Sequence, residues 1–180
     1  MARAASKKLL KELPTEQEMR DILADLKSQG DAATALLSAA YLEHTLEAIF
    51  KALFRNLNSE DSDRMFDGSA GGILGTFAAK IRVAYAIRMI GEKQYNDLLL
   101  INDIRNVFGH SLHKVTFDHE LVALDCSKFS GLPDFREMGL QLSMPIDQFS
   151  HVTLTTYILM RQKLRNQTLA KHLRRGAPDA

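Results

Sequence analysis

The sequence lacks several features that would point to particular classes of protein. Its 180 residues include one cysteine, no tryptophan and four prolines. The single cysteine, Cys126, cannot form an intramolecular disulfide, which favours a reducing compartment. The longest stretch without Asp, Glu, Lys or Arg is 148–160, 13 residues, whereas a membrane-spanning helix needs roughly 18 or more. The N-terminus carries no apolar block typical of a secretory signal. We therefore expect a cytoplasmic protein without membrane contact.

An excess of one charge is also missing, with 23 basic and 22 acidic residues and a net charge of +1. Any binding of nucleic acid or acidic partners must therefore depend on local clusters. His110 and His113 lie three residues apart, but no carboxylate or cysteine completes a metal-binding set. We expect neither a metal nor a cofactor. Hydrophobic residues make up 46% of the chain, enough for the core of one domain.

Helical periodicity dominates most of the chain. Thr15 lies three residues before Glu18, a capping-box spacing that predicts a helix start, and Gly30 ends this first helix. Apolar residues recurring with a period near 3.6 predict four further helices. Their expected ranges are 33–57, 73–90, 92–109 and about 146–173.

A polar connection, "NLNSEDSDRMFDGSAGG", joins the helices expected at 33–57 and 73–90, and it is expected to be a mobile loop. Its glycines raise the possibility of phosphate binding before a helix. A P-loop needs Lys followed by Ser or Thr after its last glycine, but Gly75 is followed by Thr76 and Phe77. We therefore interpret this segment as a flexible entry to the next helix.

The segment "HKVTFDHELVALDCSKF", residues 113–129, is rich in β-branched and aromatic residues and predicts a short β-hairpin. Cys126 would lie in a strand as a small buried residue rather than a nucleophile. The expected fold class is thus mainly α: a single-domain bundle of about five helices, with a small β-hairpin between the fourth and last helices. The predicted organisation is a flexible N-terminal arm at 1–13, a helical domain at 14–175 and a frayed tail at 176–180.

The last helix ends in a cluster of basic residues with no acid among them. A helix C-terminus favours cations through its dipole alone, so a solvated helix end is one interpretation. The other is contact with a nucleic-acid backbone. Aromatic residues do not alternate with these cations, and no helix-turn-helix pair is evident, so sequence-specific reading of DNA is not supported. The candidates are Arg161, Lys163, Arg165, Lys171, Arg174 and Arg175.

The stretch "LLLINDIRNVFGH", residues 98–110, ends an apolar helix with three polar side chains. At 100° per residue, Asp103, Asn106 and His110 lie within about 60° of one another, whereas Arg105 points away from that strip. Arg105 would meet His110 only if Gly109 broke the helix or if the arginine reached a second subunit.

These side chains have two interpretations. His110 could accept a 2′-hydroxyl proton while Arg105 stabilises the phosphorane charge and Asn106 orients either group, giving metal-independent RNA cleavage. Alternatively, Arg105 pairs with a carboxylate such as Asp103 or Glu47, and His110 caps the helix. Spacing alone favours the second, structural interpretation.

Three blocks, "AAYLEHTLEAIFKALF", "GTFAAKIRVAYAIRMIG" and "LLLINDIRNVFGH", resemble the mannitol operon repressor family, over roughly residues 30–115. The resemblance implies a transcriptional repressor without a recognisable DNA-reading motif that acts through a protein partner. We expect a homodimeric regulator of this type rather than an enzyme. The positions that match the family pattern are His44, Glu47, Thr76, Phe77, Lys80, Ile81, Arg105, Asn106, Gly109 and His110.

The family is similar in turn to HEPN helical domains, whose active members are metal-independent ribonucleases. In these, an Arg-x4–6-His motif faces its copy across a homodimer; "RNVFGH" has four residues between Arg105 and His110. The resemblance thus keeps an endoribonuclease using Arg105, Asn106 and His110 as the alternative to a repressor. As binding residues we select His44, Glu47, Lys80, Arg105 and His110, and we expect His44 and Lys80 to approach the Arg105 region.

Overall fold

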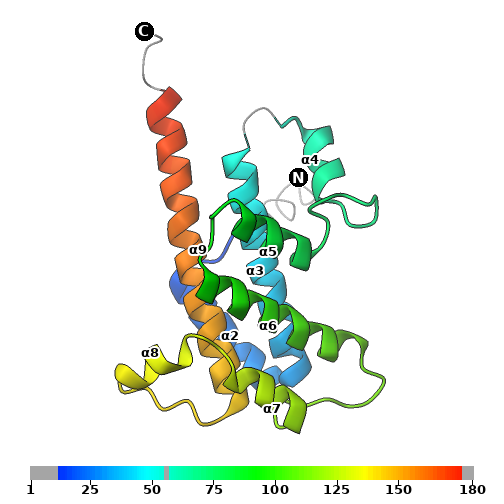
Figure 1. The fold of residues 1–180 in the computed structure, drawn as a ribbon, viewed down its shortest axis with the longest axis vertical. Helices are drawn as coiled ribbons and strands as arrows, with labels where there is room; N and C mark the ends of the chain where they lie inside the picture. Colours follow the sequence, from blue (N-terminus) through cyan, green and yellow to red (C-terminus); the bar gives the residue numbers. More distant parts are fainter. Residues whose placement is uncertain (1–11, 55–56, 176–180) are drawn as a thin grey trace, which may run out of the picture.

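A computed structural model describes residues 12–54 and 57–175, and of 170–175 it describes the backbone alone. Eight helices and no strand occur in this part of the chain, arranged as a bundle around one central helix (Figure 1). The predicted mainly α class is confirmed, whereas the number of helices was underestimated. The helices are α2 (Glu16–Gln29), α3 (Asp31–Leu53), α4 (Ser59–Phe66), α5 (Phe77–Ala86), α6 (Glu92–His110), α7 (Glu120–Ser127), α8 (Leu132–Glu137) and α9 (Pro145–Arg175).

The central helix is α3, which packs against α2, α5, α6 and α9. Apolar residues spaced three and four apart on α3, Leu42, Leu46 and Ile49, are fully buried, as helical periodicity predicts. Phe50 lies at the end of this strip and stacks on Phe54 at 5.6 Å between ring centroids. The C-terminal turns of α9 extend beyond the rest of the bundle (Figure 1).

The first helix begins and ends where the sequence predicts. Both hydrogen bonds of the Thr15–Glu18 capping box are present. Gly30 ends α2 with φ of 115°, in the region that favours glycine. Asp31 is the first residue of α3, and its carboxylate accepts a hydrogen bond from the backbone amide of Phe117, 2.8 Å away. It thereby fixes the segment after α6 to the start of α3.

The predicted β-hairpin is wrong, because the segment that follows α6 forms turns and the helix α7 instead. Its buried residues Val122, Cys126 and Phe129 are spaced four and three apart, which is a helical period rather than a strand alternation. β-branched composition was outweighed by burial against α6 and α9, which α7 contacts. A further short helix, α8, begins within the segment "SGLPDF", residues 130–135.

The polar connection after α3 is a helix followed by a compact glycine loop, and the long third helix expected at 73–90 is shorter than predicted. Asn58 caps α4 through the amide of Asp61. The loop then closes on itself: the Gly72 amide donates to the Asp67 carbonyl, and the Leu74 amide donates to the Met65 carbonyl. Because Leu74 is buried at the end of this loop, the loop is a packed element rather than a plain linker.

The end of α5 forms a Schellman motif with an arginine at the position where glycine is usual. The Met89 amide donates to the Ala84 carbonyl, and the Arg88 amide donates to the Tyr85 carbonyl, which is the pairing of a Schellman motif. Glycine is usual at the left-handed position of this motif, but here it is Arg88, with φ of 57°. A residue with a Cβ atom adopts this conformation at a cost of about 1 kcal/mol relative to glycine.

The predicted arm and tail fall largely outside the described residues, which leave out 1–11 and 176–180, so the domain limits stay a prediction. Within the described part, the Leu13 carbonyl accepts a hydrogen bond from Arg161, and the Pro14 carbonyl accepts one from the Tyr157 hydroxyl. No helix in that part is both long enough and apolar enough to cross a membrane.

Candidate functional site

The end of α6 carries the polar side chains that the sequence singled out. The helix continues unbroken through Gly109 to His110, so Arg105 and His110 are not brought together by a break. Arg105 instead donates from Nη1 to Oδ1 of Asn106, 2.9 Å away. His110 is exposed, and its side chain makes no hydrogen bond or ion pair with any residue that the structure describes. Its imidazole is therefore open to an external group.

The structural interpretation of Arg105 and His110 finds no support in these contacts. Within the described part of the chain, Arg105 forms no ion pair with Asp103 or Glu47; Glu47 instead pairs with Lys51 and Lys80. The residue that caps α6 is Ser111 rather than His110.

The end of α6 lies against the start of α3. A Cβ atom on Gly109 would be 3.4 Å from Cδ2 of Leu36, so the absence of a side chain there allows close packing. The helical period places Leu37 and His44 on one side of α3, and Asn106 and His110 on one side of α6. We call these four residues the α3/α6 face. Leu37 is 47% exposed.

Beneath this face lies a buried lysine. Lys80 of α5 is 2% exposed, and its Nζ lies 2.8 Å from Oε1 of Glu43 and 3.5 Å from Oε2 of Glu47. Glu47 also pairs with Lys51 at 2.6 Å. This network joins α5 to α3. Sequence reasoning selected Lys80 and Glu47 but missed Glu43, although its spacing of four from Glu47 places both carboxylates on one side of α3.

The structure thus brings together part of the predicted binding set. Lys80 and Glu47 form one ion pair, next to the helical turn of His44. The ring of His44 is exposed and bonds the Ala40 carbonyl at 2.8 Å. No hydrogen bond or ion pair joins Lys80 or His44 to Arg105 among the described residues. Lys80 is buried, Glu47, Arg105 and Asn106 are half-buried, and His44 and His110 are exposed.

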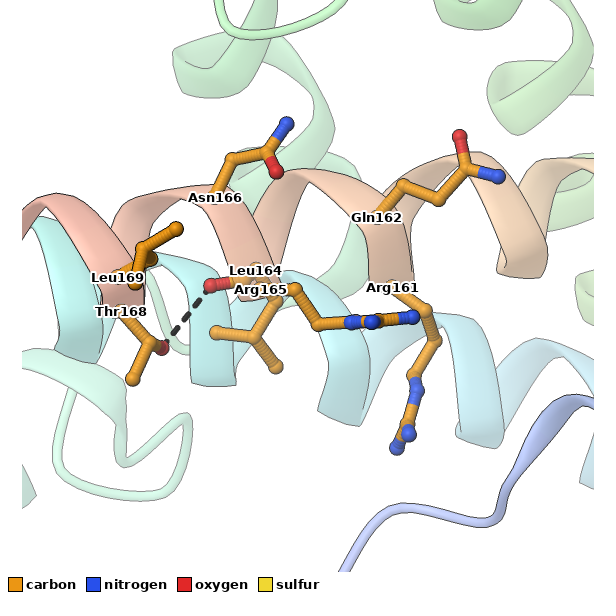
Figure 2. A pocket seen from close by; sticks show the side chains of 7 residues that line it. All are labelled: Arg161, Gln162, Leu164, Arg165, Asn166, Thr168 and Leu169. Atoms are coloured by element: carbon orange, nitrogen blue, oxygen red, sulfur yellow. Dashed lines mark hydrogen bonds between the residues drawn. The ribbon is translucent and has the colours of Figure 1, made fainter.

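The basic C-terminal cluster is partly used inside the molecule. Arg161 Nη1 donates to the Leu13 carbonyl at 2.9 Å, and Lys163 donates to the Met89 carbonyl. Arg165 forms no hydrogen bond or ion pair with the described residues. Figure 2 shows Arg161 on one side of α9, and Gln162 and Asn166 on the other. These side chains border an open hollow of about 760 Å³. The side chains of Lys171, Arg174 and Arg175 lie outside the described part.

Three buried titratable groups serve packing rather than chemistry. Burial raises the pKa of the Cys126 thiol to about 12, so this thiol is a poor nucleophile, as the sequence indicates. Burial likewise raises the pKa of Tyr157 to about 12. Burial also raises the pKa of Asp97, whose carboxylate accepts the Ser130 amide at 2.6 Å and so fixes the approach to α8 against α6. The described residues contain no cluster of three or more metal-binding side chains.

The geometry can be compared with that of known proteins. No family model matches the sequence, and no curated protein matches it. The fold is similar to that of a chain in the X-ray structure of the MtlR–HPr complex from Escherichia coli, with a TM-score of 0.53 at 13% identity. The match covers 83% of this chain and 98% of that chain.

This chain has the fold found in the MtlR–HPr complex. The resemblance to the mannitol operon repressor family, which three sequence blocks predicted, therefore holds at the level of the fold. The identity is too low to carry residue roles from that complex to this chain. The use of the α3/α6 face must be argued from its own chemistry.

Proposed function

We propose that this protein is a regulator of the mannitol-repressor type that acts by binding a protein partner on its α3/α6 face. The observation that carries the proposal is the fold, because a chain of the same fold was solved together with a protein partner, HPr. The proposal also agrees with the absence of a helix-turn-helix signature in the sequence. It assigns His44, Arg105, Asn106 and His110 to the contact surface, and Glu47 and Lys80 to its support.

The composition of the α3/α6 face suits a protein contact. Leu37 offers an exposed apolar group, and Asn106 and His110 offer donors and acceptors around it. A central apolar anchor with a polar surround is the usual anatomy of a transient interface. Arg105 has one donor engaged with Asn106, and its remaining donors are available for a partner carboxylate or carbonyl. The buried Lys80 network fixes α5 against α3 behind this surface.

Isothermal titration of the purified chain with Escherichia coli HPr tests the proposal. We expect binding in the micromolar range, which is typical of small transient contacts. Replacing Leu37→Asp or His110→Ala should weaken it about 5- to 30-fold, the effect of losing about 1–2 kcal/mol at an interface. Met138→Asp is the matched control, because Met138 is 67% exposed but follows α8. Equal losses for Met138→Asp and Leu37→Asp would contradict the assigned face.

A second candidate function is metal-independent RNA cleavage. The observation that favours it is the Arg105–Asn106 hydrogen bond, which turns the guanidinium toward the strip that ends in the exposed His110. The reaction would need the two copies of a homodimer to face each other. Incubation of labelled RNA with the protein in EDTA should then produce cleavage that His110→Ala abolishes, with a loss of at least about 100-fold. Cleavage that persists in His110→Ala would instead identify a contaminating nuclease.

A further inference from the structure

Acidic residues are missing from two long segments of a chain that is nearly neutral overall. Residues 68–91 and 148–175 contain nine of the 23 basic residues and none of the 22 acidic ones. The structure places these segments next to each other, because Lys163 of α9 donates to the Met89 carbonyl in the α5–α6 turn. Of these nine cations, Lys80 is buried against Glu43 and Glu47, and the side chains of three lie outside the described part. The other five are Arg82, Arg88, Arg161, Lys163 and Arg165, and they belong to segments that contain no acidic residue, a local excess that the net charge of +1 conceals.

An aromatic pair with one exposed member lies at this junction. Tyr85 of α5 stacks on Tyr95 of α6 with ring centroids 4.3 Å apart and an interplanar angle of 18°. Tyr85 is 40% exposed, so part of its ring remains open to another planar group. Arg82 lies one helical turn before Tyr85 and is also exposed. Across the turn, Gln162 and Asn166 extend from the side of α9 opposite Arg161 (Figure 2).

The conformation of Arg88 is an independent sign of function. Its φ of 57° lies where glycine is favoured, and its side chain is exposed. The Arg88 backbone closes the Schellman motif at the end of α5, but its guanidinium forms no hydrogen bond or ion pair with the described part of the chain. Because glycine would close this motif without the backbone strain, we take the arginine side chain as a group that serves an external ligand.

We infer that this surface, formed by Arg82, Tyr85, Arg88, Gln162 and Asn166, binds single-stranded nucleic acid. The arginines would contact phosphates, the open ring of Tyr85 would stack on a base, and the two amides would bond base or sugar edges. Base stacking on Tyr85 needs an unpaired base, which favours a single strand over a duplex. The nearest carboxylate along the chain is the exposed Glu92, at the start of α6. This site is separate from the α3/α6 face.

The test is fluorescence anisotropy with a labelled 20-nucleotide oligothymidine and the full chain. This DNA lacks the 2′-hydroxyl, so the proposed RNA cleavage cannot affect the result. We expect binding that weakens with salt, with a log–log slope of about −1.5 to −2, since two or three phosphate contacts contribute about −0.7 each. No binding at about 50 mM salt and 100 µM protein would overturn the inference.

The sharpest variant is Arg88→Gly, because it should have opposite effects on stability and binding. Relief of the left-handed conformation should raise the Tm by about 2 °C. Loss of the guanidinium should weaken binding about 5-fold and reduce the salt slope by about 0.7.

Tyr85→Ala should weaken binding 5-fold or more through lost stacking. Arg20→Ala, which removes an exposed arginine from α2, should leave the affinity unchanged.

Two results would contradict this assignment. Wild-type affinity in both Arg88→Gly and Tyr85→Ala would show that the oligonucleotide binds elsewhere. Competition by polyglutamate as effective as that by unlabelled oligothymidine at equal charge would assign the surface to an acidic protein instead.

Discussion

Lys80→Met should destabilise the protein by about 2–3 kcal/mol, although it replaces one long side chain with another of similar length. Lys80 is 2% exposed and neutralises both Glu43 and Glu47. Removing one member of a buried ion pair costs about 3–5 kcal/mol when the partner charge is left without compensation. The two carboxylates are 27% and 25% exposed, so water can solvate them in part. We therefore place the loss at or below the lower end of that range.

Lys51→Met is the matched control for this prediction. Lys51 contacts the same Glu47 at 2.6 Å, but its side chain is 43% exposed, and exposed pairs contribute about 0–1 kcal/mol. Urea unfolding of both variants should separate them clearly, and the Lys80→Met transition should shift to lower urea with an unchanged slope. Adding Glu43→Gln and Glu47→Gln to Lys80→Met should recover part of the loss, because no half-buried carboxylate is then left without a cation. Lys51 loses its partner Glu47 in this variant, but an exposed lysine does so at little cost. A Lys80→Met stability within about 0.5 kcal/mol of wild type would mean that burial of Lys80 is not maintained in solution.

The long helices could be predicted from the sequence because their signals are local. The capping box at Thr15 and the stop at Gly30 fix α2 by contacts within a few residues. The last helix was expected at about 146–173 and is observed at Pro145–Arg175. Each of these signals depends on hydrogen bonds and periodicity inside one helix. Tertiary contacts were not needed to detect them.

The segment around Cys126 could not be predicted in the same way. Its β-branched residues favour a strand in isolation, but the burial of Val122, Cys126 and Phe129 against neighbouring helices selects a helix. The compact form of the glycine loop likewise depends on contacts that local periodicity does not reveal, such as the hydrogen bond from the Leu74 amide to the Met65 carbonyl. Composition alone cannot distinguish a mobile glycine-rich segment from a packed one.

The sequence predicted which residues belong to the candidate site better than it predicted how those residues are arranged. The helical strip of Asn106 and His110 follows from spacing alone. The hydrogen bond between Arg105 and Asn106 was not expected, because backbone register says little about where a long flexible side chain ends. Lys80 was selected for a binding role, but its burial against Glu43 and Glu47 depends on how α5 packs on α3. A single sequence does not contain that information.

Gly72→Ala should produce the second large loss of stability, about 2–4 kcal/mol. A Cβ atom at this position would lie 2.5 Å from the Arg64 carbonyl oxygen and 2.6 Å from that of Met65. These are backbone atoms at the end of α4, so a side-chain rotation cannot relieve the contact, and the loop must move. Overpacking of this kind typically costs 1–3 kcal/mol or somewhat more. Gly91→Ala is the control, because a Cβ atom there has no neighbour within 4 Å, and its cost should stay within about 1 kcal/mol.

The loss of stability in Gly72→Ala should begin in α4 and in the glycine loop that follows it. The loop holds Leu74 in the core at 1% exposure, and α4 places Phe66 against Phe50 with ring centroids 6.5 Å apart. If the loop moves to accommodate the methyl group, both side chains lose apolar contact. Amide hydrogen exchange should therefore accelerate in α4 and in residues 67–75 before it does in α6. Unchanged protection of α4 in Gly72→Ala would show that the close approach of Gly72 to Arg64 and Met65 does not hold this part of the bundle together.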